Sequence, residues 1–354
     1  MRLIAHLVRM ARAALTLLLW AYAFVLMGYL GLRAVVGDGL WWLSWLNNFA
    51  PYYFLPLIFT LPLSFALRLK RSALVHGFLA LVATIWLLPR FLDTPFQRVA
   101  RLNESERALT VVTFNIRGDN PQLDSFFSWL RSTNADIVLL QETPASWTHD
   151  GIPQLLDPYP YQVSLPIGAG QWGEVILSRQ PIVGHERYRV QGFPHDRIEI
   201  EWAGERIAIY NVHMVIPQRA TARLTQRFYR NYLNMILKYD DSIRNDQIDE
   251  LLALLANERL PFIAAGDFNT SDNAVAYERI AARLRDSFRE GGRGMGSTWP
   301  HARVAGLPSF IPPLIRIDYV WHSDEFQTLT TFVGPPLGSD HLPVIANLVL
   351  RESP

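Results

Sequence analysis

The stretch Gly338-Ser339-Asp340-His341-Leu342-Pro343-Val344 lies close to the C-terminus and places a carboxylate and a histidine directly before an apolar run. Four polar clusters further upstream also border apolar runs, which we interpret as buried strands. They are Thr113-Phe114-Asn115-Ile116-Arg117, Gln141-Glu142-Thr143, Gly266-Asp267-Phe268-Asn269 and Arg316-Ile317-Asp318-Tyr319. A side chain just past a strand end is held rigidly yet can reach solvent, so these clusters predict one shared site.

The composition sets broad limits on the protein class. A chain of 354 residues can bury a large core and carry a second part. Its formal net charge of +1 creates no global field that would require a polyanionic partner. The sequence has no cysteine, which excludes disulfides and thiolate metal sites. Hydrophobic residues make up 50% of the chain and are concentrated in its first quarter.

That first quarter predicts an all-α transmembrane region at 1–93 with spans at about 13–36, 50–67 and 73–88. A membrane-crossing helix needs roughly 20 apolar residues. Aromatic residues crowd the connection between the first two runs, as an interfacial belt would. A signal peptide cleaved near Ala21-Tyr22-Ala23 and buried helices of a soluble domain are the alternatives. We favour three spans because the first run continues well past Ala23 and the three runs are almost contiguous.

The distribution of Lys and Arg indicates the orientation in the membrane. Basic residues cluster before the first span and in the second connection, whereas the first connection carries only Arg33. The two clusters are Arg2, Arg9 and Arg12, then Arg68, Lys70 and Arg71. The positive-inside bias places both in the cytoplasm, and three spans then place the remaining chain outside it. Four arginines between 90 and 107 argue against this orientation.

A polar linker is expected at 94–108 and a mixed α/β domain at 109–354. Apolar runs of strand length lie at 109–116, 137–140, 175–177, 198–202, 207–212, 262–265, 317–321 and 344–350. Apolar residues recur at helical spacing at 122–132 and 248–255. Many strands with few interspersed helices predict a four-layer α/β sandwich, in which helices flank two mixed β-sheets.

The polar clusters supply ligands for a hard cation. Carboxylate and amide oxygens without thiolates suit Mg²⁺ or Mn²⁺ better than Zn²⁺. We expect Glu142 to be the main metal ligand, with Asn115 and Asp340 near the same ion. Such an ion keeps several waters and leaves room for a substrate phosphate.

The remaining polar residues supply acid–base chemistry. A histidine beside a carboxylate that fixes its tautomer is a natural general base. We expect His341 with Asp318 to activate a water for in-line attack on phosphorus. Asp267 and Asn269 would orient that nucleophile and hold a developing oxyanion.

Taken together, the motifs resemble the endonuclease/exonuclease/phosphatase superfamily over about 109–350. The matching runs are Thr-Phe-Asn-Ile (113–116), Leu-Gln-Glu (140–142), Ile-Leu-Ser-Arg (176–179), Asn-Val-His (211–213), Gly-Asp-Phe-Asn (266–269), Arg-Ile-Asp-Tyr (316–319) and Ser-Asp-His-Leu-Pro-Val (339–344). The superfamily includes pancreatic-type deoxyribonuclease, abasic-site endonucleases, neutral sphingomyelinases and inositol-polyphosphate 5-phosphatases. The resemblance implies a metal-dependent hydrolase of phosphoester bonds. It carries functional roles onto Asn115, Glu142, His213, Asp267, Asn269, Asp318, Asp340 and His341.

Three further residues take expectations from the same resemblance. Arg117 matches an arginine that meets substrate phosphate in deoxyribonuclease-like members, and a surface arginine is the alternative. Glu174 is expected to orient His213. Trp299 lies in a motif before the penultimate strand, where we expect packing rather than catalysis.

The superfamily cleaves nucleic acids, phosphoinositides, sphingomyelin and pyrophosphates, so its fold does not choose the substrate. Two features favour a lipid-linked phosphate: the membrane region, and a basic, aromatic segment at 218–241 that would lie at the rim of the site. An ordinary packed helix is the alternative for that segment. The order of spans and domain also resembles the membrane-bound glycopeptide-resistance proteins, which are thought to act on polyprenyl-type lipid phosphates.

These observations predict a multi-pass membrane phosphoesterase whose catalytic domain is extracytoplasmic and whose partner is the bilayer. A metal-dependent endo- or exonuclease acting on DNA or RNA is the alternative. A membrane-tethered binding module is disfavoured by the complete catalytic set. The sequence indicates no protein partner.

Overall fold

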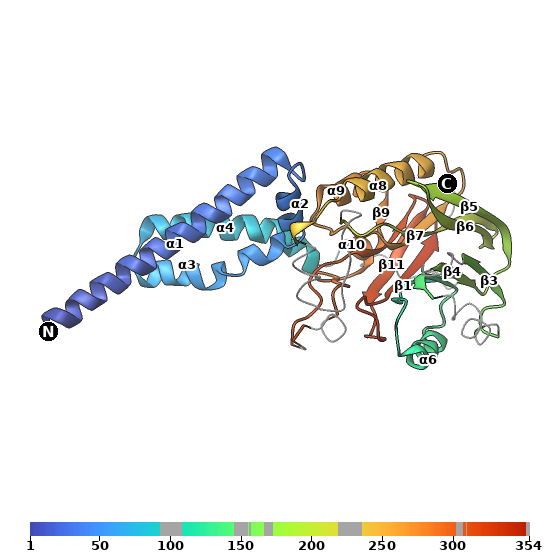
Figure 1. Ribbon diagram of the computed structural model, residues 1–354, viewed down its shortest axis with the longest axis horizontal. Coiled ribbons are helices and arrows are strands. Elements are labelled where there is room, and N and C mark those ends of the chain that lie inside the picture. Colours follow the sequence, from blue (N-terminus) through green and yellow to red (C-terminus); the bar gives the residue numbers. More distant parts are fainter. Residues whose placement is uncertain are drawn as a thin grey trace. The chain divides into compact units, whose positions relative to one another are not determined.

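The computed structural model describes residues 1–92, 108–144, 155, 157–165, 173–218, 236–301, 307–308 and 310–351. Contacts divide the chain into Met1–Leu92 and Asp93–Pro354, and Figure 1 shows the elements of each unit. The linker predicted at 94–108 lies almost wholly outside the described residues, as does most of the basic, aromatic segment at 218–241.

The first unit is all-α. It contains α1 (Arg2–Val36), α2 (Trp41–Asn47), η1 (Ala50–Phe54), α3 (Leu57–Ala66), α4 (Lys70–Leu87) and η2 (Leu88–Phe91). Two stretches, Arg2–Val36 and Lys70–Phe91, are long and apolar enough to cross a membrane. Trp41–Asn47 and Ala50–Ala66 pass the same test only as a pair, bent by 73° at their junction. By length and composition, the described residues therefore hold two candidate spans, or three if the bent pair is one span, and the three-span topology stays a prediction.

Helices α1 and α4 run in the same direction. At one end, Nη2 of Arg12 donates a 3.0 Å hydrogen bond to the main-chain oxygen of Leu67, just before α4 begins. At the other end, the Arg33 guanidinium lies over the Trp86 ring, 5.1 Å from its centroid. The basic N-terminus and the basic α3–α4 connection therefore lie at the same end of this unit.

The second unit is built on two six-stranded mixed sheets. One has the order β11 (Phe326–Val333), β12 (Val344–Leu350), β1 (Leu109–Asn115), β2 (Ile137–Thr143), β4 (Gly173–Ser178), β3 (Tyr161–Leu165). The other has the order β5 (Ile182–Val190), β6 (Phe193–Trp202), β7 (Glu205–His213), β8 (Phe262–Asp267), β10 (Asp318–His322), β9 (Arg285–Asp286). The helices are α6 (Leu123–Thr133), α8 (Ser242–Leu255), α9 (Val275–Ala281) and α10 (Ser287–Gly291).

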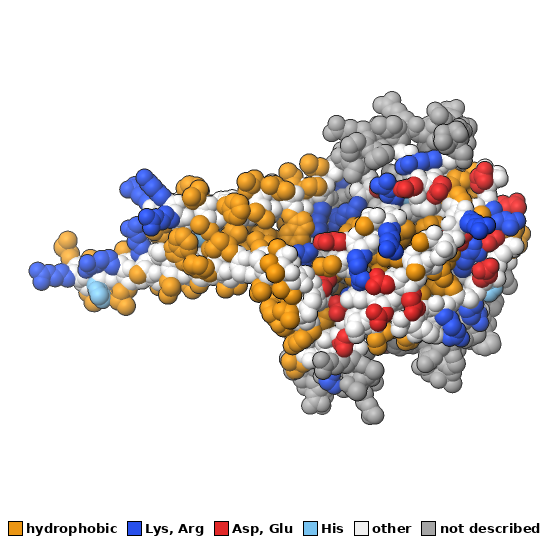
Figure 2. Space-filling view, turned by 90° about the horizontal axis from the view of Figure 1, so that it is seen from above, with side chains coloured by type: hydrophobic (Ala, Val, Ile, Leu, Met, Phe, Trp, Pro, Cys, Tyr) orange, Lys and Arg blue, Asp and Glu red, His pale blue; other side chains and the backbone are white. Residues whose placement is uncertain are grey.

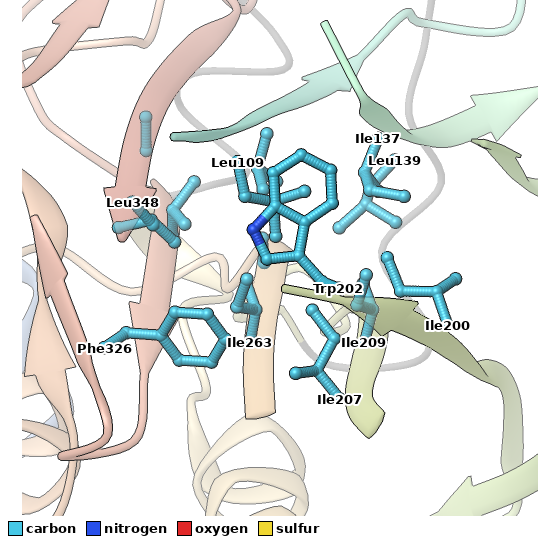
Figure 3. Packing of buried hydrophobic residues seen from close by; sticks show 14 of the residues in the cluster. Leu109, Ile137, Leu139, Ile200, Trp202, Ile207, Ile209, Ile263, Phe326 and Leu348 are labelled. Atoms are coloured by element: carbon cyan, nitrogen blue, oxygen red, sulfur yellow. The ribbon is translucent and has the colours of Figure 1, made fainter. Parts of the chain in front are cut away.

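Apolar side chains hold the two sheets face to face. Residues of both sheets form one buried cluster, and Figure 3 shows the Trp202 indole at its centre, close to Leu109 and Ile209. A second cluster joins the outer face of the first sheet to α6, and a third joins the outer face of the second sheet to α8 and α9. The helices on both outer faces confirm the predicted four-layer α/β sandwich.

The topology brings the motif-bearing strand ends together. Strands β1 and β2 are parallel, with Asn115 opposite Gln141. In the other sheet β7 and β8 are parallel, with His213 opposite Asp267, and β10 begins with Asp318 opposite Asp267. Because parallel strands end at the same edge of a sheet, both sheets present their polar ends at one edge of the sandwich.

Candidate active site

Asn115 links the two sheets at this edge. Its Nδ2 donates 3.0 Å hydrogen bonds to Oε1 of Glu142, in its own sheet, and to Oδ2 of Asp267, in the other. Its Oδ1 accepts a 3.1 Å hydrogen bond from the main-chain N–H of Arg117. The buried amide therefore holds two carboxylates of the site at a fixed separation. In this arrangement it acts toward both carboxylates as a donor, so its role as an oxygen ligand stays a proposal.

Glu142 reaches the site through an irregularity in its strand. The pairing of β2 with β4 shifts register between Leu140 and Thr143, and Glu142 adopts φ 55°. A bulge re-aims a side chain, and a left-handed backbone at a non-glycine residue is strained. The bulge therefore explains why Glu142 departs from regular strand geometry where it meets Asn115.

Asp267 is positioned by the close approach of β7 and β8. A Cβ at Gly266 would lie 1.7 Å from the main-chain oxygen of Val212, so only glycine fits here. Past the strand, the main-chain N–H of Asn269 donates to Oδ1 of Asp267 (2.9 Å), and its side chain donates to the main-chain oxygen of Met214 (2.9 Å). The Gly-Asp-Phe-Asn motif thus holds its carboxylate and its amide next to each other.

His341 lies between two buried carboxylates. Its Nδ1 is 3.0 Å from Oδ2 of Asp318, and its Nε2 is 3.7 Å from Oδ2 of Asp267. An Nδ1–H bonded to Asp318 leaves Nε2 free to exchange a proton with a water near Asp267. This is the His–Asp pairing that the sequence predicts for a general base.

The charges of this trio shift its titration. Burial lowers the pKa of His341, but Asp318 and Asp267 outweigh that effect and hold the pKa well above its ordinary value. Burial, with Asp318 nearby, raises the pKa of Asp267 to about 7. The trio therefore retains a proton near neutral pH that it can exchange with a bound water.

The C-terminal loop that carries His341 is tied to the first strand. Oγ of Ser339 donates a 2.7 Å hydrogen bond to the main-chain oxygen of Asn115 and accepts one of 3.1 Å from the main-chain N–H of His341. Gly338 has φ 85°, and a Cβ there would lie 2.1 Å from Oδ1 of Asn120. Glycine and serine are thus required where the sequence has them.

Asp340 receives a contact that the sequence did not predict. Nε1 of Trp299 donates to its Oδ2 at 3.1 Å. Trp299, for which we expected packing, therefore also orients a proposed metal ligand.

His213 and Glu174 do not form the hydrogen-bonded pair that the sequence analysis expects. Nε2 of His213 lies 3.8 Å from Oε1 of Glu142, and burial lowers the pKa of His213 to about 4. Glu174, expected to orient His213, instead accepts a 2.6 Å hydrogen bond from Nδ1 of His195. Both members of this pair are buried, and both lie near enough to His213 to influence its charge. No pattern in the sequence singled out His195.

The donor set fits a divalent cation. Burial raises the pKa of Glu142, so its ionised form needs a compensating positive charge. Asp340 lies close enough to Glu142 to raise that pKa further, and two carboxylates would then face one ion. Asp267, Asp318 and His341 form a second candidate group, whose ligand atoms lie within 4.8 Å of one another. We prefer the Glu142 position for the cation, because Asp318 already hydrogen-bonds Nδ1 of His341 and this pair is the predicted general base.

Arg117 lies at the edge of this group. It has φ 57° and pairs with the exposed Asp119, while its own side chain is partly buried. This ion pair does not decide between the phosphate role and a surface role.

A buried ion pair supports the strand that carries Asp318. Nη1 and Nη2 of Arg316 donate to the two carboxylate oxygens of Asp286 at 2.9 and 2.5 Å, and Arg316 is 1% exposed. Such a bidentate pair fixes two segments with a defined geometry. The sequence placed Arg316 in a motif but predicted no partner for it.

Comparisons with known proteins agree with this geometry. A sequence profile of the Endonuclease/Exonuclease/phosphatase family matches residues 112–341. A search of curated proteins found no match to the chain. Among solved structures, the chain is similar to an endonuclease/exonuclease/phosphatase from Bacteroides vulgatus (TM-score 0.53, 19% identity, covering 70% of this chain and 100% of that one). It is also similar to a family protein from Leptotrichia buccalis (0.52, 17%, 68% and 99%) and to TDP2 from C. elegans (0.52, 16%, 70% and 77%). At these identities the likeness shows the fold.

Proposed function

The chain belongs to the endonuclease/exonuclease/phosphatase family and is a hydrolase acting on phosphoester bonds, and from this premise we propose that its substrate is a lipid-linked phosphate or pyrophosphate. The observation that carries the proposal is the presence, in one chain, of this hydrolytic site and of helices long and apolar enough to span a membrane. An enzyme held at a bilayer meets lipid-linked substrates at high effective concentration. The proposed protein is a membrane-anchored, Mg²⁺- or Mn²⁺-dependent phosphoesterase.

We assign the cation to Glu142, with Asn115 and Asp340 beside it. When bound, the cation would neutralise charge on a phosphate oxygen and polarise the phosphorus for attack. Once neutral, His341 takes the proton of the attacking water through Nε2, because Nδ1 is engaged by Asp318. A cation held at Glu142 would favour the neutral imidazole by opposing its positive charge. A water that contacts both Nε2 of His341 and Oδ2 of Asp267, which lie 3.7 Å apart, would be oriented by both groups.

The remaining side chains stabilise charge in the transition state. The Asn269 amide lies beside Asp267, and His213 lies beside Glu142. Both groups are assigned to the oxygens of the phosphate that gain negative charge. Arg117 is assigned to bind a non-reacting oxygen of the substrate phosphate. To do so, its side chain would leave its ion pair with Asp119.

The direction of the membrane helices supports an extracytoplasmic site. Parallel α1 and α4 require the intervening segment, which includes the bent pair, to return across the membrane. Three crossings would then leave the chain that follows α4 on the side of the membrane opposite the basic ends. Those ends carry Arg12 and the Arg68–Lys70–Arg71 cluster, which the positive-inside bias assigns to the cytoplasm. Nucleic acid is not the routine substrate outside the cytoplasm.

The proposal is tested with the full chain purified in detergent. Initial rates are measured on a long-chain lipid phosphate, on a short water-soluble phosphodiester, and on single- and double-stranded DNA and RNA, with His341→Ala as the blank. We expect kcat/KM to be highest for the lipid phosphate. Higher turnover of DNA or RNA would replace this proposal with the nuclease alternative. A topology reporter fused after Pro354 tests the orientation separately.

A further inference from the structure

The first unit carries a groove beside α4 that the hydrolytic site does not explain. The groove has a volume of about 600 Å³ and an almost wholly apolar lining. Its apolar residues include Phe65 of α3 and Ala73, Gly77, Phe78 and Leu81 of α4. The cations Arg68, in the α3–α4 connection, and Lys70, the first residue of α4, also line it. The groove therefore has one charged end and a long apolar part.

The groove, its charged end included, has about the length of one membrane leaflet. From Lys70 to Leu81 the helix advances eleven residues, which corresponds to about 16 Å at 1.5 Å per residue. The hydrocarbon core of a bilayer is about 30 Å thick, so the groove covers about half of it. A groove of this length, open along a membrane helix, matches one acyl chain rather than a spanning helix of a partner.

The charged end selects for an anion. Arg12 lies there as well, since it donates to the main-chain oxygen of Leu67 next to Arg68. Figure 2 shows Lys and Arg side chains gathered at the end of this unit near the N-terminus, with hydrophobic side chains covering the remainder. Basic pockets between membrane helices bind anionic head groups, and each Lys or Arg near the membrane surface adds about 1 kcal/mol.

We propose that this groove binds one anionic phospholipid, with its phosphate at Arg68 and Lys70 and one acyl chain along Ala73, Gly77 and Leu81. The inference rests on membrane insertion, which belongs to the proposed function, and is independent of the hydrolytic chemistry. Phosphatidylglycerol serves as the probe. Two cations at about fivefold each predict an about 25-fold preference for phosphatidylglycerol over phosphatidylcholine.

Gly77 offers a direct way to close the groove. A Cβ at Gly77 would meet nothing within 4 Å, so a larger side chain can enter the open space without a clash. Gly77→Leu is expected to fill the apolar part while leaving the helix intact. Gly31→Leu is the matched control, because Gly31 of α1 also has nothing within 4 Å and does not line the groove.

The experiment compares lipids retained by the full chain. Five proteins are extracted from membranes and exchanged into nanodiscs of phosphatidylcholine that contain phosphatidylglycerol at a mole fraction of about one tenth, so that selective binding is visible. They are the wild type, Gly77→Leu, its control Gly31→Leu, Arg68→Gln/Lys70→Gln, and its charge control Arg2→Gln/Arg9→Gln. Native mass spectrometry after release then counts the bound lipids. We expect one retained phosphatidylglycerol in wild type and both controls. Gly77→Leu should reduce its occupancy at least about tenfold, as expected when a large apolar contact is lost.

Each outcome bears on a separate claim. The Arg68→Gln/Lys70→Gln variant should still retain a lipid but lose the preference for phosphatidylglycerol. Equal retention of both lipids by wild type, or unchanged phosphatidylglycerol in Gly77→Leu, would overturn the lipid site. A dimer of the chain that Gly77→Leu dissociates would show that a second copy occupies the groove instead. Recovery of wild type in the soluble fraction would overturn membrane anchoring rather than the groove.

Discussion

Oγ of Ser339 donates a 2.7 Å hydrogen bond to the main-chain oxygen of Asn115, a residue 224 positions earlier in the chain. This contact fastens the loop that carries Asp340 and His341 to the end of β1, where Asn115 joins Glu142 to Asp267. The Ser339 hydroxyl thereby helps to hold His341, the proposed base, close to Glu142, the proposed metal ligand. The site is assembled by such long-range contacts, and they can be removed one at a time.

Ser339→Ala should lower both stability and kcat while leaving every proposed chemical group in place. The hydroxyl is fully buried, so its loss leaves the Asn115 oxygen and the His341 N–H without this partner. We expect a loss of about 1–3 kcal/mol in the free energy of unfolding. Thermal unfolding and steady-state kinetics check both effects. Ser132→Ala, at an exposed helix position, should change neither; equal behaviour of the two variants would contradict the anchoring role.

The Glu142→Gln variant should fold but lose most of the metal-dependent turnover and the stabilisation by divalent cations. Burial raises the pKa of Glu142, so removing its charge should raise the melting temperature of the metal-free protein. Mg²⁺ should stabilise the wild type, because a ligand that binds only the native state raises its melting temperature. The variant should show no such rise and little turnover. Glu205→Gln, at an exposed strand end, is the matched control; a wild-type Mg²⁺ response in Glu142→Gln would remove the metal assignment.

His341→Ala and Asp318→Asn should each lower kcat, and the double variant should be little worse than His341→Ala. Asp318 acts through Nδ1 of His341, at 3.0 Å, and residues that act as one unit are strongly non-additive. Single-turnover rates at saturating enzyme measure the three losses. If the two losses simply add, Asp318 contributes to catalysis by another route.

Gly266→Ala should be far more harmful than Gly204→Ala. Both glycines have positive φ, so both substitutions introduce backbone strain of about 1 kcal/mol or more. Only at Gly266 would the new Cβ meet an atom, the Val212 oxygen at 1.7 Å; at Gly204 nothing lies within 4 Å. We expect Gly266→Ala to lose soluble expression of the folded chain or more than about 4 kcal/mol of stability. Similar melting temperatures for both variants would show that β7 and β8 approach less closely.

The Arg316–Asp286 pair should make stability depend on acid pH. Burial alone would raise the pKa of Asp286, but the charge and hydrogen bonds of Arg316 outweigh it and leave the pKa below its ordinary value. A carboxyl with a lowered folded-state pKa contributes stability above its unfolded pKa of about 3.9, and this is lost as pH falls through the folded pKa. Asp286→Asn should therefore cost about 3–5 kcal/mol at pH 7.

Melting temperatures of wild type and Asp286→Asn, measured from about pH 7 down to about pH 3, test this sign. The difference between the two proteins should be constant near neutral pH and should narrow below about pH 4. Asp324→Asn is the matched control, because its arginine partner Arg285 and its own side chain are both exposed. A difference that widens in acid would contradict the assignment.

The sequence alone was sufficient for the family, the fold class and the residue types of the site. Each motif combines an apolar run with a polar end, and both signals are local, so a reader of the sequence can find them without knowing what the strands pair with. The same holds for the first and last long apolar helices of the first unit, whose length and composition are properties of short segments. The sequence did not predict the strands β3, β5, β9 and β11 or the short helices α9 and α10. Two of these strands lack such a signal, because β5 is largely exposed along its length and β9 has two residues.

Only the tertiary structure decided which polar groups meet. The sequence predicts Asn115 near a metal ion, and only the fold shows that its amide donates to two carboxylates from different sheets. Glu174 was expected to orient His213 and instead accepts a hydrogen bond from His195, and Arg316 pairs with Asp286. The physical reason is that a hydrogen bond depends on separations of about 3 Å, whereas a strand pattern constrains only which way a side chain faces. Contacts between residues far apart in the chain are therefore set by sheet packing, which no local pattern encodes.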